Sequence, residues 1–229
     1  MPDAADNLVT IGRALRRLGL ANAVFVGGAT VGLHLTDKAS LAPRVTLDVD
    51  LVVGTSTRHQ FYVLEERLRD AGHQPDATGP IGRWLIDGVP VDLTPTTEGV
   101  LGTTNRWYPL LYETADDIEI APGLTVRVAT PPMFLATKLE AHKDRGAADP
   151  TMSQDLTDIV SLVNGRPSLE AEVGAMPPEA RDFVRAAVRE LLAEPDFEFV
   201  VHAHLPPDDA SQGRSTLVLA ALRRLAGDP

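Results

Sequence analysis

Short apolar runs and segments of helical spacing alternate along the first third of the chain. Apolar residues recur at helical spacing over 8–18 and again over 61–71, and each of these two segments stops at a glycine, which predicts two amphipathic helices. The apolar run 23–26 predicts a buried strand, and the small-residue segment 29–35 predicts a helix after it. The β-branched run 45–53 is the strongest strand pattern of the chain.

Shorter alternating runs follow and predict two hairpins. Residues 84–86 and 89–93 flank Asp87-Gly88, a dipeptide typical of two-residue hairpin turns. Residues 118–120 and 124–128 flank Pro122-Gly123 in the same way. The sheet is therefore predicted to be at least partly antiparallel.

The pattern becomes helical after the break Thr130-Pro131-Pro132. Helices are predicted over 133–143, 156–163, 180–192 and 217–225. We therefore expect an α+β fold, with a mixed sheet and flanking helices over residues 1–130 and a mostly helical C-terminal region over residues 131–229.

Composition narrows the classes of function. The 229 residues include 21 Lys and Arg against 32 Asp and Glu, a net charge of −11, which argues against broad wrapping of a nucleic-acid backbone. The chain has no cysteine, which excludes thiolate nucleophiles and cysteine-ligated zinc or iron–sulfur centres. The first residues are acidic and no apolar run approaches the roughly 18 residues of a membrane span, so a cytoplasmic protein without a membrane partner is expected.

Two carboxylates on the predicted strand 45–53 are the first candidate for chemistry. Asp48 and Asp50 are two residues apart, so in a strand both side chains point to the same face, with Cα atoms about 6.5 Å apart. A divalent cation such as Mg²⁺ would offset their repulsion. Asp92, on the predicted strand 89–93, would add a third carboxylate if the two strands are neighbours. The alternative, that all three acids lie on a solvated surface, is also open.

Gly27-Gly28 lies between a buried strand and a helix. Glycines at such a turn allow close approach of a phosphate to backbone N–H groups, but a tight turn without a ligand has the same sequence pattern. The spacings of a dinucleotide-binding fingerprint and of a P-loop are absent.

Basic and acidic residues lie on the first two predicted C-terminal helices. Lys138 and Arg145 fall on one helical stripe with Ala141 between them, which leaves room for an anion, and a solvated basic face is the alternative. Asp155 and Asp158 on the next helix could anchor these cations or position a nucleophile. Acids that only stabilise the N-terminus of that helix are the alternative, above all at Asp155.

In order along the chain, these segments resemble the AbiEii-type, MenT-like nucleotidyltransferase toxins of the polymerase-β-like nucleotidyltransferase superfamily. The resemblance covers about residues 20 to 165. The matching segments are Val26-Gly27-Gly28-Ala29, Arg44-x-Thr46-x-Asp48-x-Asp50-Leu51, Val91-Asp92-Leu93, Lys138-x-x-Ala141-x-x-x-Arg145 and Asp155-x-x-Asp158. Gln154 departs from the pattern, in which a basic residue commonly precedes the first of these last two acids.

The resemblance implies a role for each matching residue. Metal ligands at Asp48 and Asp50 are implied, with Asp92 as a third ligand or general base. It also implies triphosphate-binding cations at Lys138 and Arg145, and a late catalytic-motif acid at Asp158. Nucleotide-binding positions are implied at Gly27, Gly28, Arg44 and Thr46.

The implied function is Mg²⁺-dependent transfer of a nucleotide from a nucleoside triphosphate such as ATP to an acceptor hydroxyl, with a helical C-terminal region closing the cleft. A tRNA acceptor and a cognate antitoxin protein are expected. Two alternatives stay open: an aminoglycoside-type small-molecule acceptor, and a non-catalytic module that binds a nucleotide or a partner.

Overall fold

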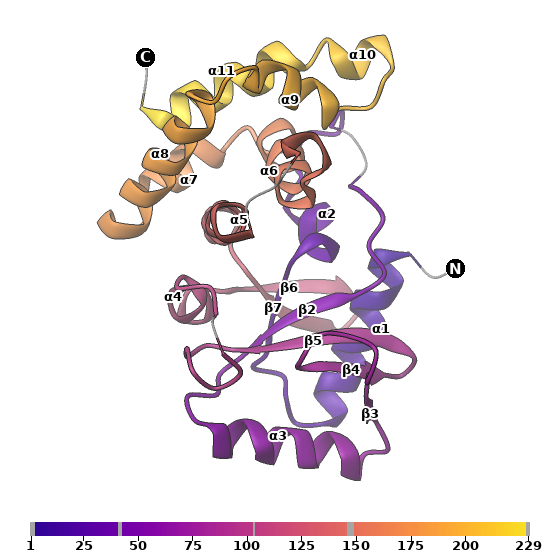
Figure 1. The fold of residues 1–229 in the computed structure, drawn as a ribbon. Helices are drawn as coiled ribbons and strands as arrows, with labels where there is room; N and C mark the ends of the chain where they lie inside the picture. Colours follow the sequence, from indigo (N-terminus) through magenta and orange to yellow (C-terminus); the bar gives the residue numbers. More distant parts are fainter. Residues whose placement is uncertain (1–2, 41–42, 103, 146–148, 228–229) are drawn as a thin grey trace. The chain divides into compact units, whose positions relative to one another are not determined.

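The computed structural model describes residues 3–40, 43–102, 104–145 and 149–227 (Figure 1). The chain divides into two compact units. The first, here called the sheet unit, combines the segment up to Thr30 with Val45–Thr130. The second, the helical unit, combines Val31–Arg44 with the chain from Pro131 onward.

A seven-stranded mixed sheet forms the sheet unit, with strand order β3-β4-β5-β2-β1-β7-β6. The strands are β1 (Val24–Val26), β2 (Val49–Val53), β3 (Gln74–Pro75), β4 (Arg83–Ile86), β5 (Val89–Pro95), β6 (Asp116–Ala121) and β7 (Leu124–Val128). The pairs β2–β5 and β1–β7 are parallel, whereas both predicted hairpins are antiparallel. The predicted mixed sheet is therefore confirmed.

Turn chemistry explains the first hairpin. Asp87 and Gly88 both have positive φ, 49° and 81°, as a two-residue turn of this hand requires. The turn sets Ile86 opposite Val89, and this register continues along both strands.

The helices of the sheet unit are α1 (Ala4–Arg17), α3 (Arg58–Asp70) and α4 (Tyr108–Glu113), with a 3₁₀ turn η1 (Gly28–Thr30) after β1. Asp3 caps α1 by accepting a hydrogen bond from the Asp6 backbone N–H. The buried stripe of α1, including Ile11 and Leu15, packs against β6 and β7. Figure 1 shows α3 running beneath the sheet, where its buried residues are Phe61, Leu64 and Leu68.

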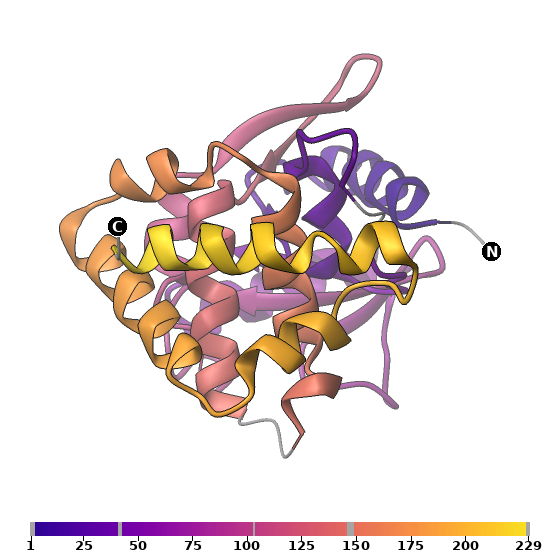
Figure 2. The same ribbon diagram turned by 90° about the horizontal axis from the view of Figure 1, so that it is seen from above.

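The helical unit contains α2 (Val31–His34), α5 (Pro131–Arg145), η2 (Pro150–Met152), α6 (Gln154–Gly165), α7 (Leu169–Gly174), α8 (Pro178–Leu192), α9 (Phe197–Ala203), α10 (Asp209–Gln212) and α11 (Ser215–Ala226). The four predicted C-terminal helices are confirmed as α5, α6, α8 and α11, each longer by a few residues. Figure 2 shows α11 lying over other helices of this unit, and it packs along α8.

Residues 31–44 belong to the helical unit because several contacts hold them there. His34 is buried against the Phe134 ring, with ring centroids 5.1 Å apart. Arg166 donates a hydrogen bond to the His34 carbonyl oxygen at 2.8 Å, and Arg214 pairs with Asp37 at 2.7 Å.

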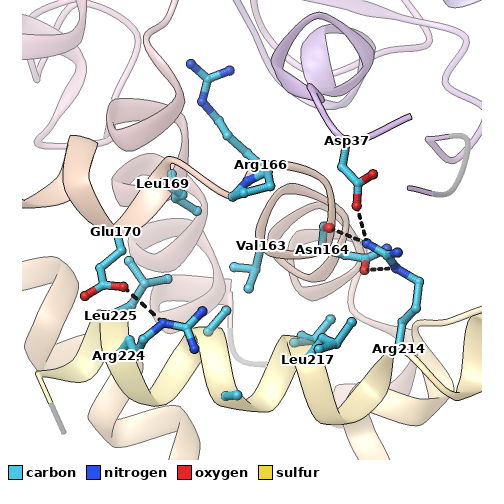
Figure 3. Close-up of a pocket in the computed structure, with 14 residues that line it drawn as sticks. Asp37, Val163, Asn164, Arg166, Leu169, Glu170, Arg214, Leu217, Arg224 and Leu225 are labelled. Atoms are coloured by element: carbon cyan, nitrogen blue, oxygen red, sulfur yellow. Dashed lines mark hydrogen bonds and ion pairs between the residues drawn. The ribbon is translucent and has the colours of Figure 1, made fainter. Parts of the chain in front are cut away.

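A cavity of about 240 Å³ lies among α6, α7 and α11 of the helical unit (Figure 3). Leucine and valine side chains, including Val163 and Leu217, form much of its wall. Arg214 pairs with Asp37, and Arg224 pairs with Glu170. None of the residues predicted to take part in catalysis or nucleotide binding lines this cavity.

The predicted strand 45–53 is wrong at its start, because β2 begins only at Val49. Val45 and Leu47 are exposed, by 81% and 56%. The neighbouring strand β1 ends at Val26, opposite Asp50, and the chain turns away at Gly27, so the preceding residues have no strand to pair with on that side. Asp48 therefore lies in the segment that leads into β2.

Candidate functional site

Asp50 and Asp92 lie side by side on the sheet. In the parallel pair β2–β5, Asp50 is the direct register partner of Asp92. Neighbouring strands are about 4.8 Å apart, and paired residues point to the same face of a sheet. The expectation that the strand of Asp92 lies beside that of Asp50 is thus confirmed. With Asp48, these two acids are here called the carboxylate site.

A glycine makes room for Asp50. Gly27, directly after β1, has φ +75°, and a Cβ atom there would lie 1.8 Å from Asp50 Oδ2 and 2.6 Å from Cγ. Any side chain at position 27 would therefore displace the carboxylate. Gly28 is buried and begins η1, whose Thr30 hydroxyl donates a hydrogen bond to the Gly27 carbonyl oxygen at 2.9 Å. The demonstrated role of this turn is steric.

Arg83 joins Asp48 to Asp92. Its Nε and Nη2 atoms donate hydrogen bonds to the two oxygens of Asp92 at 2.6 and 2.7 Å, and Nη2 also donates to Asp48 Oδ2 at 2.8 Å. Hydrogen bonding to Asp92, together with the charges of both carboxylates, raises the pKa of the Arg83 guanidinium above its ordinary value, although partial burial opposes this. The guanidinium thus offsets the repulsion expected between these carboxylates.

Sequence reasoning did not single out Arg83, although the predicted hairpin contained the signal. Counting outward from the Asp87-Gly88 turn places residue 83 opposite residue 92, which is the observed register. Among the described residues, no three His, Asp or Glu side chains are gathered closely enough to form a ready metal site.

The predicted basic residues of the helical unit form a compact ion-pair cluster. Its members are Arg44, Lys138, Arg145, Asp155 and Asp158. Asp158 is almost fully buried, and it accepts hydrogen bonds from Arg44 at 2.8 and 3.1 Å and pairs with Lys138 Nζ at 2.7 Å. Asp155 accepts from Lys138 at 3.3 Å and pairs with Arg145 at 2.7 Å.

The cluster settles one open question about the acids of α6. Asp155 anchors both Lys138 and Arg145, as one of the sequence interpretations held. Three cations against two carboxylates leave one surplus positive charge within the cluster. The Arg145 side chain is 69% exposed, whereas that of Lys138 is 12% exposed. The exposed Arg145 guanidinium at the end of α5 thus donates to Asp155 through Nε and Nη2.

Thr46, also predicted to bind nucleotide, belongs to the sheet unit. Its side chain is buried, and its hydroxyl has no hydrogen-bond partner among the residues that the structure describes. A buried hydroxyl without a partner costs about 1–3 kcal/mol.

The comparison with family models gives the class of protein, a nucleotidyltransferase. The model of the family described as "Nucleotidyl transferase AbiEii toxin, Type IV TA system" matches residues 13–220. The chain therefore belongs to the AbiEii family of nucleotidyltransferase toxins from type IV toxin–antitoxin systems.

Two further comparisons add less information about this chain. No curated protein sequence matches the chain. Among solved structures, it is similar to an antigenic nucleotidyltransferase-like protein from Paracoccidioides brasiliensis, with 19% sequence identity and a TM-score of 0.49 over 88% of this chain and 93% of that chain. No helix in the described ranges is long and apolar enough to cross a membrane.

Proposed function

We propose that this nucleotidyltransferase moves a nucleotide from a nucleoside triphosphate to a hydroxyl of tRNA, with Mg²⁺ held by Asp48, Asp50 and Asp92. The observation that carries the proposal is the register of β2 and β5, which sets Asp50 directly beside Asp92. Adjacent acids that share a face of a sheet repel each other, and a divalent cation would add to the positive charge of Arg83 that offsets this repulsion.

The residues of the carboxylate site fit a divalent cation in two respects. Carboxylate oxygens are the hard ligands that Mg²⁺ prefers. Gly27 leaves the Asp50 carboxylate a space that any Cβ atom would fill. Arg83 already contacts oxygens of Asp48 and Asp92, so a metal ion would meet its guanidinium there. When bound, the metal would supply Lewis-acid stabilisation of the charge that develops on the triphosphate.

The chain's own residues would position the reactants. In the proposed reaction the acceptor hydroxyl oxygen forms a bond to the α-phosphorus, its proton passes to a base, and pyrophosphate leaves. Asp92 is the candidate for that base if it is not used as a third ligand. Gly27 and Gly28 are proposed to lie against the phosphates.

In the helical unit, Lys138 and Arg145 are proposed to bind the triphosphate. The surplus positive charge of the ion-pair cluster supports this role. Asp158 is proposed to act as a positioning residue, because its buried carboxylate holds both Lys138 and Arg44. Arg44 and Thr46 are proposed nucleotide contacts, and the buried hydroxyl of Thr46 would gain a partner from a bound nucleotide.

The family name supports a cognate antitoxin as a partner, and tRNA is the proposed acceptor of this toxin. A cationic small molecule such as an aminoglycoside is the second candidate acceptor, because the net charge of −11 attracts cations.

Labelling with α-³²P nucleoside triphosphates tests the proposal. Wild-type protein is incubated with Mg²⁺ and either total tRNA or an aminoglycoside panel, and the labelled acceptor identifies the substrate class. Asp50→Asn and Asp92→Asn are expected to lower labelling by at least about a hundredfold, because the charged oxygens that hold the metal are lost. Asp87→Asn is the matched control, since Asp87 lies in the same hairpin but pairs with Arg17.

Labelling by Asp50→Asn at the wild-type rate would rule out the proposed metal site. If wild-type protein labels no acceptor while Mg²⁺ with a nucleoside triphosphate raises its melting temperature, a non-catalytic nucleotide-binding module becomes the better description.

A further inference from the structure

Arg83 uses the same oxygen atoms that a metal ion at the carboxylate site would need. Both oxygens of Asp92 and Oδ2 of Asp48 accept hydrogen bonds from its guanidinium at 2.6 to 2.8 Å. The contact with Asp92 is bidentate, the strongest geometry for an arginine and a carboxylate.

The position of Arg83 is built into the sheet unit. Arg83 is the direct register partner of Asp92 across the β4–β5 pair. Its backbone N–H donates to the Pro80 carbonyl oxygen at 3.1 Å, and its carbonyl oxygen accepts from the Asp76 N–H at 2.9 Å. Gly79 leaves space for the side chain, because a Cβ atom at position 79 would lie 2.3 Å from Arg83 Cδ.

A divalent cation and this guanidinium would compete for the shared oxygens. Mg²⁺ binds carboxylate oxygens at about 2.0–2.1 Å and keeps several water molecules around it, so an arginine N–H could stay only on a lone pair that the ion does not use. The two positive charges also repel each other at this distance. Binding of one therefore weakens binding of the other.

We propose that Arg83 competes with the divalent cation for Asp48 and Asp92. Its guanidinium stabilises the two acids in the metal-free protein, and its charge opposes binding of the cation to the oxygens that it contacts. Arg83 is therefore a positioning residue that sets the metal concentration at which the site loads. The inference rests on the proposed function, in which these acids hold the metal.

Direct metal titration without nucleotide or acceptor tests the inference. Free Mn²⁺ is followed by electron paramagnetic resonance during titration of wild-type protein, Arg83→Gln and Arg83→Lys. Removing the competing charge is expected to tighten Mn²⁺ binding by about tenfold in Arg83→Gln. The Mn²⁺ affinity of Arg83→Lys is expected to lie between those of wild type and Arg83→Gln, because an ammonium group cannot bridge two carboxylates in the bidentate manner of a guanidinium.

Arg17→Gln is the matched control. It removes one positive charge from the same unit, and Arg17 pairs with Asp87 in the turn of the same hairpin. Its Mn²⁺ affinity is expected to stay within about twofold of wild type, since a distant exposed charge is screened by salt. Melting temperatures in EDTA provide a second readout: Arg83→Gln is expected to melt lower than wild type, and Mn²⁺ is expected to reverse the difference.

The sign of the change separates competition from a purely structural role. If Arg83 had only a structural role, its removal would leave Mn²⁺ affinity unchanged or weaken it. Either result, in folded Arg83→Gln and Arg83→Lys, would overturn the inference. Tighter binding only in the Arg83 variants would support it. If neither wild-type protein nor any Arg83 variant bound Mn²⁺, the inference would fall together with the proposed metal site, whereas equal binding by all would overturn the inference alone.

Discussion

At the residue scale, Gly27 links backbone conformation to the carboxylate site. Its φ of +75° is unfavourable for residues with a side chain, and a Cβ atom would collide with the Asp50 carboxylate. Gly27→Ala is therefore expected to lose about 1–2 kcal/mol of unfolding free energy from backbone strain and, in addition, to weaken Mn²⁺ binding by displacing Asp50. Urea denaturation and Mn²⁺ titration measure the two effects.

Gly123→Ala separates strain from collision in this prediction. Gly123 lies in the β6–β7 turn with φ +72°, and a Cβ atom there would have no neighbour within 4 Å. The control is expected to show a similar loss of stability and unchanged Mn²⁺ affinity. An equal effect of both variants on Mn²⁺ would show that the contact between Gly27 and Asp50 has no part in metal binding.

The residues of the carboxylate site and those that contact them differ in how far the sequence reveals them. Asp50 and Asp92 are visible as acids within apolar runs, and their strands proved to be neighbours. Arg83 is not visible in this way, because its importance depends on a pairing across the hairpin rather than on its own neighbours in the sequence. Gly27 is visible as a turn residue, but the sequence gives no sign of its fit against Asp50.

At the element scale, periodicity located most helices, whereas strand pairing decided where β2 begins. The first turns of helices are poor in apolar residues, and so α6 starts at Gln154, where Ser153 caps it, rather than at the predicted 156. The short elements α4, α7, α9 and α10 have too few residues for a reliable period. The start of β2 depends on where β1 ends, which is a tertiary fact that no local pattern contains.

Helix α2 provides a pH-dependent contact within the helical unit. Burial is the main cause that lowers the pKa of His34 to about 4, and nearby Arg166 lowers it further, while Glu172 opposes the change. The folded protein thus keeps His34 neutral between its ordinary pKa of 6.5 and about 4, whereas the unfolded chain takes up a proton in this range. We expect stability to fall by up to about 3 kcal/mol as the pH drops from 6.5 to 4.

His34→Gln tests this pH dependence. Free energies of unfolding are measured from urea curves between pH 7.5 and 4, and the variant is expected to lack the part of the slope that arises between pH 6.5 and 4. Exposed His59 on α3 gives the control variant His59→Gln, which is expected to keep the wild-type slope. Identical slopes for wild type and His34→Gln would mean that His34 titrates equally in the folded and unfolded states.

At the scale of the whole molecule, the division into units was only partly accessible to sequence reasoning. The change from mixed elements to helices at Thr130 is visible in the hydrophobic pattern. The attachment of residues 31–44 to the helical unit is not, because it depends on His34 packing on Phe134 and on ion pairs such as Arg214–Asp37. Contacts between residues a hundred or more positions apart leave no periodic signal.

The net charge of −11 predicts how binding of the proposed tRNA acceptor responds to salt. An acidic protein can offer phosphates only a few local cations, and each contact contributes about −0.7 to −0.9 to the slope of log affinity against log salt concentration. With about three phosphate contacts, the slope is expected to be close to −2 to −3.

Filter binding of labelled tRNA measures this slope between about 50 and 300 mM salt. The protein used is Asp50→Asn, which is expected to bind the acceptor without turning it over. Arg145→Gln, on the exposed side of the ion-pair cluster, is expected to make the slope shallower by about 1, whereas Arg224→Gln, whose partner is Glu170, is expected to leave it unchanged. A slope of about −6 or steeper would instead require an extended basic surface, and the expectation of few local contacts would be wrong.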